Sequence, residues 1–262
     1  LGVVYLGLIS TLSSSGNVEL RGMLGKAIFG LVIALELITI SFTAPAITAG
    51  MLTSERERKT YDLLRVSLLP ASDLVTGKYL SGLVFVFLLV LTSLPLMGPA
   101  FMIGGISLPE ILIAAAVLLI TAIAFCAMGI FFSSLFRRTL ISIVFTYGIS
   151  ILLVFGIPFI SLIILIIFGA SIDNSARGLS LGTANALFVL GWLLVALTPL
   201  ASILATEIAY IDQNTWWLFT VNLPQNAKMT LVSPWVIYVI FYLILSGLLL
   251  WVSIRLNRRK EI

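Results

Sequence analysis

The chain has no histidine, a single cysteine, and charged side chains at only 10% of its 262 residues. The lone cysteine, Cys126, has no second thiol with which to form a disulfide within the chain. Without histidine, the chain cannot build a self-contained histidine site for zinc, haem or copper. Because a soluble domain is about one quarter charged, a chain with so little charge cannot cover a water-facing surface. The composition therefore excludes an ordinary soluble domain, and we expect no metal site and no catalytic residues.

Apolar residues make up 60% of the chain, and the mean hydropathy is +1.19. They occur in continuous runs and do not alternate with polar residues, which favours helices over the strands of a membrane barrel. A helix needs about 20 apolar residues to cross a bilayer. We therefore predict an all-α polytopic membrane protein in which residues 1–262 form a single transmembrane domain.

Six transmembrane helices are expected. Residues 1–12 are too short to cross, so we interpret them as the outer half of a first span that starts before the sequence does, followed by a polar connection over 13–26. The remaining spans are predicted at 27–52, 79–98, 111–133, from Leu140 towards Ala170, and from Pro234 to Trp251. The fifth run is too long for one straight crossing and contains Gly156 and Pro158, so we expect a kink there.

Residues 171–233 are harder to place, because the apolar run 186–205 is interrupted by Pro199. This run either crosses the membrane or lies at its outer side as a re-entrant or interfacial segment. With six spans, one side of the membrane holds five, two and four Lys/Arg in its three segments, and the other holds two, none and two. Since basic residues accumulate on the cytoplasmic side, we favour an extracytoplasmic 171–233 and a cytoplasmic carboxyl terminus.

The most polar stretch is 54–78, between the second and third predicted spans. It contains seven charged residues between Glu55 and Arg65, and Lys78 at its far end. We predict a short helix over 54–67 with pairs Glu55–Lys59 and Arg58–Asp62 at i, i+4, ended by the proline at position 70. Ser72 or Asp73 is expected to cap the next helix. On composition alone, this stretch is a solvated loop that only sets topology.

The stretch resembles the first cytoplasmic loop of the ABC-2 type transporter permeases, which often reads E-R-E-x-G-T-x-[DE]-x-L-L-x-[ST]-P-x-S and later G-K. Here residues 55–64 read ERERKTYDLL, residues 69–72 read LPAS, and Gly77-Lys78 follow. Lys59 stands where glycine is usual, and Leu68 and Leu69 lengthen the step before the proline. The six-span layout, the outer helical segment and the S-P-W start of the last span are also similar to this family.

The resemblance implies a coupling helix that sits in a groove of a separate ATPase subunit and transmits its movement to the spans. The residues it assigns to coupling are Glu55, Arg56, Glu57, Arg58, Lys59, Thr60, Tyr61, Asp62, Leu63 and Leu64. The chain has no G-x-x-x-x-G-K-[ST] phosphate-binding loop, so ATP and magnesium would belong to the partner, and no cofactor is expected on this chain. The further partners implied are a second permease copy or a paralogue, and the bilayer of a prokaryotic plasma membrane. Export is the expected direction.

Glu36 lies near the middle of the second predicted span, on one helical face with Thr39 and Thr43. A carboxylate at this depth is costly, so this face is a candidate substrate path or conformational latch; the alternative is a glutamate that only holds helices together. Pro45 is either a hinge or a static kink. Because the other basic residues flank spans, we interpret them as topology anchors and expect no nucleic-acid partner. An intramembrane enzyme or a passive channel remain the alternative functions.

Overall fold

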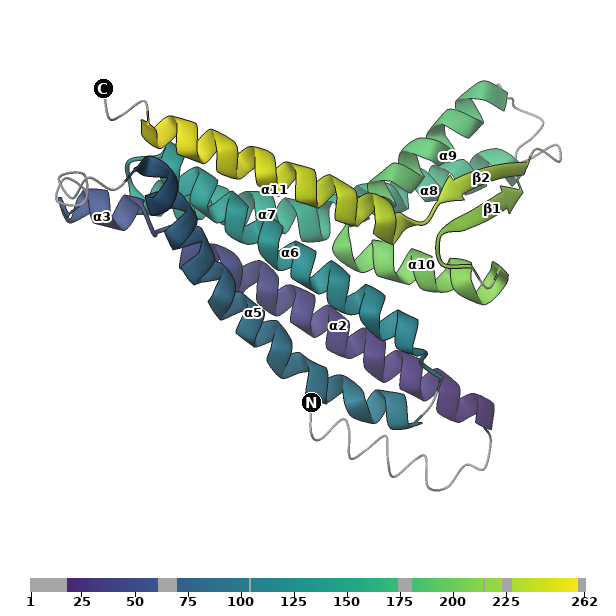
Figure 1. Ribbon diagram of the computed structural model, residues 1–262. Helices are drawn as coiled ribbons and strands as arrows, with labels where there is room; N and C mark the ends of the chain where they lie inside the picture. Colours follow the sequence, from purple (N-terminus) through teal and green to yellow (C-terminus); the bar gives the residue numbers. More distant parts are fainter. Residues whose placement is uncertain are drawn as a thin grey trace.

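The computed structural model describes residues 18–60, 70–103, 105–173, 181–213, 215–222 and 228–258. Figure 1 shows an elongated bundle whose helices lie side by side at one end and diverge towards the other. Its elements are, in order, α2 (Val18–Thr48), α3 (Thr53–Glu57), α5 (Ala71–Ile103), α6 (Leu108–Leu135), α7 (Thr139–Ile151), η1 (Leu152–Gly156), α8 (Ile157–Asp173), α9 (Leu181–Ala196), α10 (Pro199–Gln213), β1 (Leu218–Asn222), β2 (Lys228–Val232) and α11 (Pro234–Arg258).

Five of the described helices are long and apolar enough to cross a membrane, and the bent pair α9–α10 can be counted as a sixth. The predicted spans at 27–52, 79–98, 111–133, from 140 and from 234 each fall on one of these helices. The protein is therefore a helical polytopic membrane protein. The predicted first span at 1–12 lies outside the described residues. The polar connection predicted over 13–26 is wrong from Val18 onward, because α2 already begins there.

Helix α6 lies at the centre of the bundle and packs against α2, α5, α7, α10 and α11. Its most apolar stretch is 56% buried, whereas the corresponding stretches of the other spans are 17% to 44% buried. The Tyr238 hydroxyl of α11 lies 2.8 Å from the Thr121 hydroxyl of α6, and both residues are fully buried. A hydrogen bond between two such groups satisfies polarity that would otherwise be costly in this apolar interior.

Two local sequence signals correspond to features of the helices. The backbone N–H of Ser107 donates to Glu110 Oε2 at 2.8 Å, which closes one half of a capping box at the start of α6. The helix from Thr139 onward changes to π-helical geometry over η1, directly before Pro158. Since Pro158 has no backbone N–H to donate, the regular hydrogen-bond ladder cannot continue there.

Helices α9 and α10 form a sharp V, with a 115° bend at residues 197–198. The Tyr242 hydroxyl donates to the Leu197 carbonyl at 2.9 Å, which places the bend two turns into α11, about 12 Å from its first residue. Further along α10, Thr206 Oγ1 lies 3.4 Å from Ser233 Oγ, at the start of α11. The pair therefore enters the bundle and returns towards the same end, where the antiparallel hairpin β1–β2 also lies (Figure 1). The sequence did not predict this hairpin.

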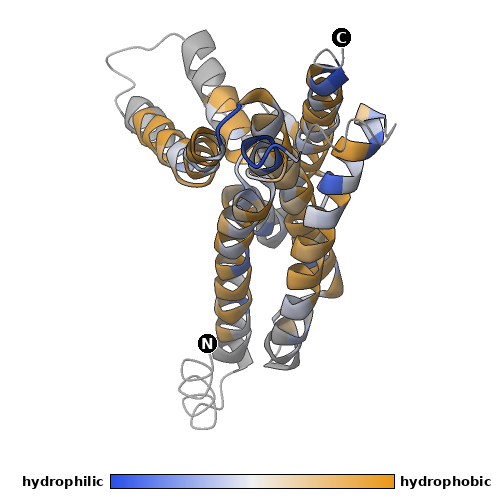
Figure 2. Ribbon diagram, turned by 90° about the vertical axis from the view of Figure 1, so that its left-hand side faces the viewer, coloured by the Kyte–Doolittle hydropathy of each residue, from blue (hydrophilic) through white to orange (hydrophobic). Residues whose placement is uncertain are grey.

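One end of the bundle carries three basic segments. Helix α3, the α6–α7 connection with Arg137 and Arg138, and the carboxyl-terminal end of α11 gather at one end (Figure 1). Figure 2 looks at the bundle from this end, and hydrophilic residues stand there in front of mostly hydrophobic helices. The three basic segments identified in the sequence thus share one end of the molecule.

Candidate functional site

Helix α3 is a five-residue helix that follows α2 after a four-residue turn, and a side chain from α6 fixes its start. The first N–H groups of a helix have no partner within it, and Leu52, at the N-cap, has no side chain that can accept them. Ser133 Oγ of α6 accepts both the Leu52 N–H at 2.9 Å and the Thr53 N–H at 3.1 Å. Because Ser133 is fully buried, it ties the start of α3 firmly to the central helix.

Arg56 connects α3 to the ends of two spans. Its guanidinium donates to the carbonyl of Phe136 at 2.9 Å and to that of Ser134 at 3.2 Å, at the carboxyl-terminal end of α6. It also donates to Asn257 Oδ1 of α11 at 2.6 Å. A cation at the carboxyl-terminal end of a helix is favourable, because the unpaired carbonyls there carry negative partial charge. The resemblance assigned Arg56 to coupling with a partner, and the structure directs its side chain into the protein.

The two glutamates of α3 bind two further helices. Glu57 accepts the backbone N–H and the hydroxyl of Thr139, both at 2.8 Å, at the first turn of α7. A carboxylate at a helix amino terminus is favourable, because the free N–H groups there carry positive partial charge. Glu55 forms an ion pair with Lys78 of α5. Helix α3 is therefore joined by side chains to α5, α6, α7 and α11 at a single end of the bundle.

The end of α3 is a Schellman motif. The Thr60 N–H donates to the Glu55 carbonyl at 3.0 Å, and the Lys59 N–H donates to the Arg56 carbonyl at 3.2 Å. Lys59 has φ of +58°, in the left-handed region that glycine adopts without steric cost. The lysine thus stands at the position where the family motif has glycine, and the backbone takes the shape that glycine favours.

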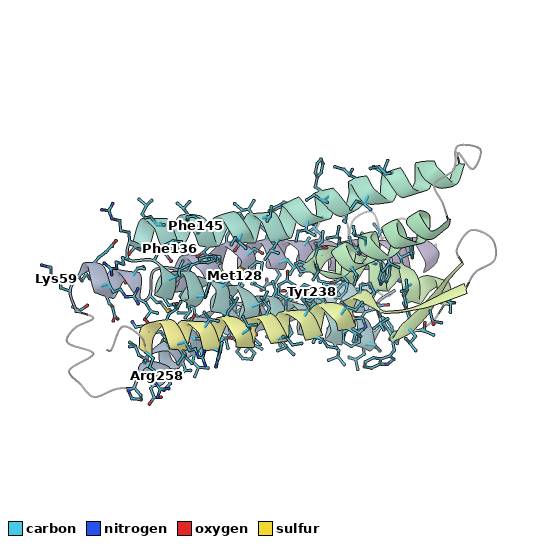
Figure 3. The ribbon with its side chains drawn as sticks, turned by 90° about the horizontal axis from the view of Figure 1, so that it is seen from above. Lys59, Met128, Phe136, Phe145, Tyr238 and Arg258 are labelled. Atoms are coloured by element: carbon cyan, nitrogen blue, oxygen red, sulfur yellow. The ribbon has the colours of Figure 1, made fainter. Side chains whose placement is uncertain are left out.

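Residues 58–60, here called the α3 tip, project from the end of the bundle. All three are exposed, and Figure 3 shows Lys59 pointing away from the helices at the same end as Arg258. Two of the three carry positive charge, so the described part of the tip is a basic, solvent-facing surface. The other predicted coupling residues, Tyr61, Asp62, Leu63 and Leu64, lie outside the described residues.

Three local predictions for this stretch are corrected by these contacts. The predicted 54–67 helix ends at Glu57, because the chain turns into the left-handed region at Lys59. The predicted Glu55–Lys59 pair is absent, since Glu55 pairs with Lys78. Helix α5 begins directly after Pro70, so Ser72 and Asp73 lie in its first turn and are not its cap. The predicted Arg58–Asp62 pair involves a residue outside the described part of the chain.

The second predicted site, on α2, is only partly enclosed. Thr39 is exposed and its hydroxyl donates to the Leu35 carbonyl of its own helix at 2.8 Å, while Glu36 and Thr43 are half-buried. Glu36 Oε1 is buried and has no hydrogen-bond partner among the described residues. Helix α2 runs on through Pro45, which is buried. The structure thus places the three polar residues along a face that the described part of the chain leaves partly open.

Sequence reasoning missed the residues that hold α3 in place. The sequence pattern singled out none of Ser133, Thr139 and Asn257 as a contact of α3. Their contacts with α3 span between 80 and 201 positions of sequence. No periodic or spacing signal reaches that far; co-variation among related sequences is the kind of signal that could have found them.

No known protein-family model matches the chain, and a search of curated proteins finds no match either. The likeness to a family therefore rests on the local motif at 55–78 and on the layout of the spans. Within the part of the chain that the structure describes, no group of three acidic or cysteine side chains is placed to hold a metal ion.

Proposed function

We propose that this chain is the membrane-spanning subunit of an ABC-2 type transporter, and that a separate ATPase subunit docks on the α3 tip. The proposal rests on two observations about α3 and its tip. Residues 58–60 face solvent, while Glu55, Arg56 and Glu57 contact four other helices. A segment held in this way moves with the helix ends it contacts, so a push on its tip becomes a movement of the spans.

The distribution of charge and the shape of the outer segment support the same arrangement. Three basic segments share the α3 end, which on the positive-inside rule faces the cytoplasm of a prokaryotic plasma membrane. With that orientation, the V of α9 and α10 enters from the outer side and returns to it, as a re-entrant segment between spans five and six. ATP and magnesium then act in the partner on the cytoplasmic side, and closure of the partner shifts the equilibrium between inward-facing and outward-facing states.

A second copy of the chain, or a paralogue, completes the transporter in this proposal. The face of α2 with Glu36, Thr39 and Thr43 supports this part, because polar side chains on an open face are costly in lipid. The Glu36 Oε1 atom, buried and without a partner among the described residues, would gain one from the second copy. We take this face as the substrate path or latch, with Pro45 as the hinge beside it.

The test is retention of an ATPase by the protein purified from its native membranes in mild detergent. We expect a chain with a phosphate-binding loop and ATPase activity to co-purify with the wild type. Reversing two charges of the α3 tip, in Arg58→Glu/Lys59→Glu, should lower the retained activity at least 10-fold, because charges at an interface rim steer association and exclude wrong pairings.

The matched control is Arg258→Glu, which reverses a charge at the same end of the bundle but on α11. Retention of the ATPase by Arg258→Glu and its loss from the tip variant would support docking on α3. Equal retention by both variants, or no ATPase with the wild type, would overturn the proposal. Ion flux through liposomes holding this chain alone would then point to a passive channel, and turnover of lipid or peptide to an intramembrane enzyme.

A further inference from the structure

A large apolar cavity lies between α2 and the α8–α10 part of the bundle. It measures about 710 Å³, which is within the range of ligand pockets, and its walls come from α2, η1, α8, α9 and α10. In Figure 1, α10 lies between the α8–α9 arm and α2. Among the described residues that line it, Ser161 alone has a polar side-chain atom, and its hydroxyl already donates to the Pro158 carbonyl at 2.8 Å. The side chains of the described lining are therefore almost entirely apolar, which suits a hydrocarbon chain.

A second, smaller cavity of about 70 Å³ adjoins it and carries charge. Lys26 of α2, Glu110 of α6 and Glu207 of α10 line it. Lys26 pairs with Glu207, and Glu110, only 6% exposed, accepts the Ser107 N–H at 2.8 Å. The cluster thus holds two carboxylates and one ammonium. An unmatched carboxylate in such a site favours a cationic group on a ligand.

The two cavities share two lining residues, Leu200 and Leu204, on neighbouring turns of α10. On α2, the small cavity begins at Lys26 and the large one reaches Ile38. These positions are 12 residues apart, or about 18 Å at the rise of an α-helix. One leaflet of a bilayer has a hydrocarbon thickness of about 15 Å, half of the full core. The distance from the charged end to the apolar end thus fits one leaflet-length chain.

We propose that the joined cavities bind a single long-chain amphiphile whose head group carries a protonated amine. The chain fills the large cavity between α2 and the V of α9–α10, and the amine lies at Glu110 and Glu207. A phosphate on the same head group would meet Lys26. This site is distinct from the α3 end, and the inference stands whether or not an ATPase docks there.

The experiment measures binding of two lysolipids with the same acyl chain to the purified full chain. One is lysophosphatidylethanolamine, which carries an amine, and the other is lysophosphatidylglycerol, which does not. We expect the wild type to bind the amine-bearing probe about 10-fold more tightly in a native mass spectrometry competition. Glu207→Gln keeps the size of the side chain but leaves Glu110 as the one carboxylate beside Lys26, so the cluster no longer has an excess of negative charge. It should therefore abolish this preference and leave binding of the acyl chain intact.

A third variant tests the apolar part of the site. Ala201→Phe places a ring in the large cavity and should weaken both probes at least 10-fold, whereas Ala46→Phe, on an exposed part of α2 outside the cavity, should not. Ala205→Phe fills the same cavity from the next turn of α10 and replaces Ala201→Phe if that protein is not monodisperse. Unchanged binding by the cavity-filling variant, or equal affinity of the wild type for both probes, would overturn the proposal.

Discussion

The close approach of α2 and α6 at Gly129 gives a sharp test of how the bundle is held beneath α3. A Cβ atom built on Gly129 would lie 1.9 Å from Thr48 Oγ1, 2.8 Å from Thr48 Cβ and 3.1 Å from the Ala49 backbone nitrogen. Non-bonded heavy atoms normally lie about 3.5–4.0 Å apart. Gly129→Ala therefore forces the two helices apart by roughly 1.5 Å or expels the Thr48 side chain.

Neither response is easy for this junction. Thr48 is fully buried, and its hydroxyl donates to the Ala44 carbonyl at 2.7 Å. On its other side it packs against Gly82 of α5, where a built Cβ would lie 2.7 Å from Thr48 Cγ2. Overpacking a buried site costs about 1–3 kcal/mol, and an overlap this deep belongs at the upper limit. The better helix propensity of alanine returns about 1 kcal/mol, so we expect a net loss of about 2 kcal/mol.

The chain contains its own reporter for this measurement. Cys126 is the only cysteine in the sequence and is fully buried, one helical turn before Gly129. A thiol-reactive fluorophore can modify it only when the bundle opens, so the modification rate follows the open population. A loss of about 2 kcal/mol corresponds to a rate roughly 30-fold higher.

Two variants make the test decisive. Gly148→Ala is the matched control, because nothing lies within 4 Å of a Cβ built there; it should leave the rate unchanged or lower it. The double variant Gly129→Ala/Thr48→Ala removes the clashing Oγ1 atom and should show a favourable coupling of about 1 kcal/mol relative to the two single variants. If Gly129→Ala reacts no faster than Gly148→Ala, the close approach of the helices is not real.

Three further predictions concern α3 itself. Arg56→Ala should lower the free energy of opening the bundle by about 2–3 kcal/mol in the same thiol assay, because it removes charged hydrogen bonds to the ends of α6 and α11. Arg58→Ala at the exposed tip should change it by no more than about 0.5 kcal/mol. Equal effects of the two variants would contradict the inward placement of Arg56. Lys59→Gly should slow hydrogen exchange of the Thr60 amide about 5-fold by relieving about 1 kcal/mol of left-handed strain. Lys59→Ala, which removes the charge but keeps the Cβ atom that causes the strain, should not. Glu57→Gln should speed exchange of the Thr139 amide, since a neutral acceptor interacts more weakly with a helix amino terminus; unchanged exchange would mean that the charge plays no part there.

Much of the fold could be read from local pattern. Continuous apolar runs predicted the five described spans, because a helix in lipid must present apolar side chains on all sides and satisfies its backbone within one segment. The glycine and proline at 156 and 158 predicted an interrupted helix, since their effect acts within one or two turns. The count of Lys and Arg residues also predicted that the three basic segments lie at one end. This prediction depends only on the number of spans between them.

The sequence located the charged stretch that forms the candidate site, but it did not predict which way its side chains point. Lys59 was recognised as standing at a position where glycine is usual, and the structure gives the physical reason in its positive φ. The inward direction of Arg56 was not predictable, because it depends on carbonyls of α6 that lie about 80 residues away in the sequence.

The sequence by itself determined that this chain lies in a membrane, how many described helices are long enough to cross it, and which segment between them is charged. Tertiary structure alone decided that α3 is joined to four helices, that α9 and α10 form a V, and that an apolar cavity adjoins a charged one. The physical reason is the distance along the chain over which each kind of interaction acts. Hydropathy, capping and turn preferences act between neighbours in the chain, whereas these features arise from contacts between residues that only the packed bundle brings together.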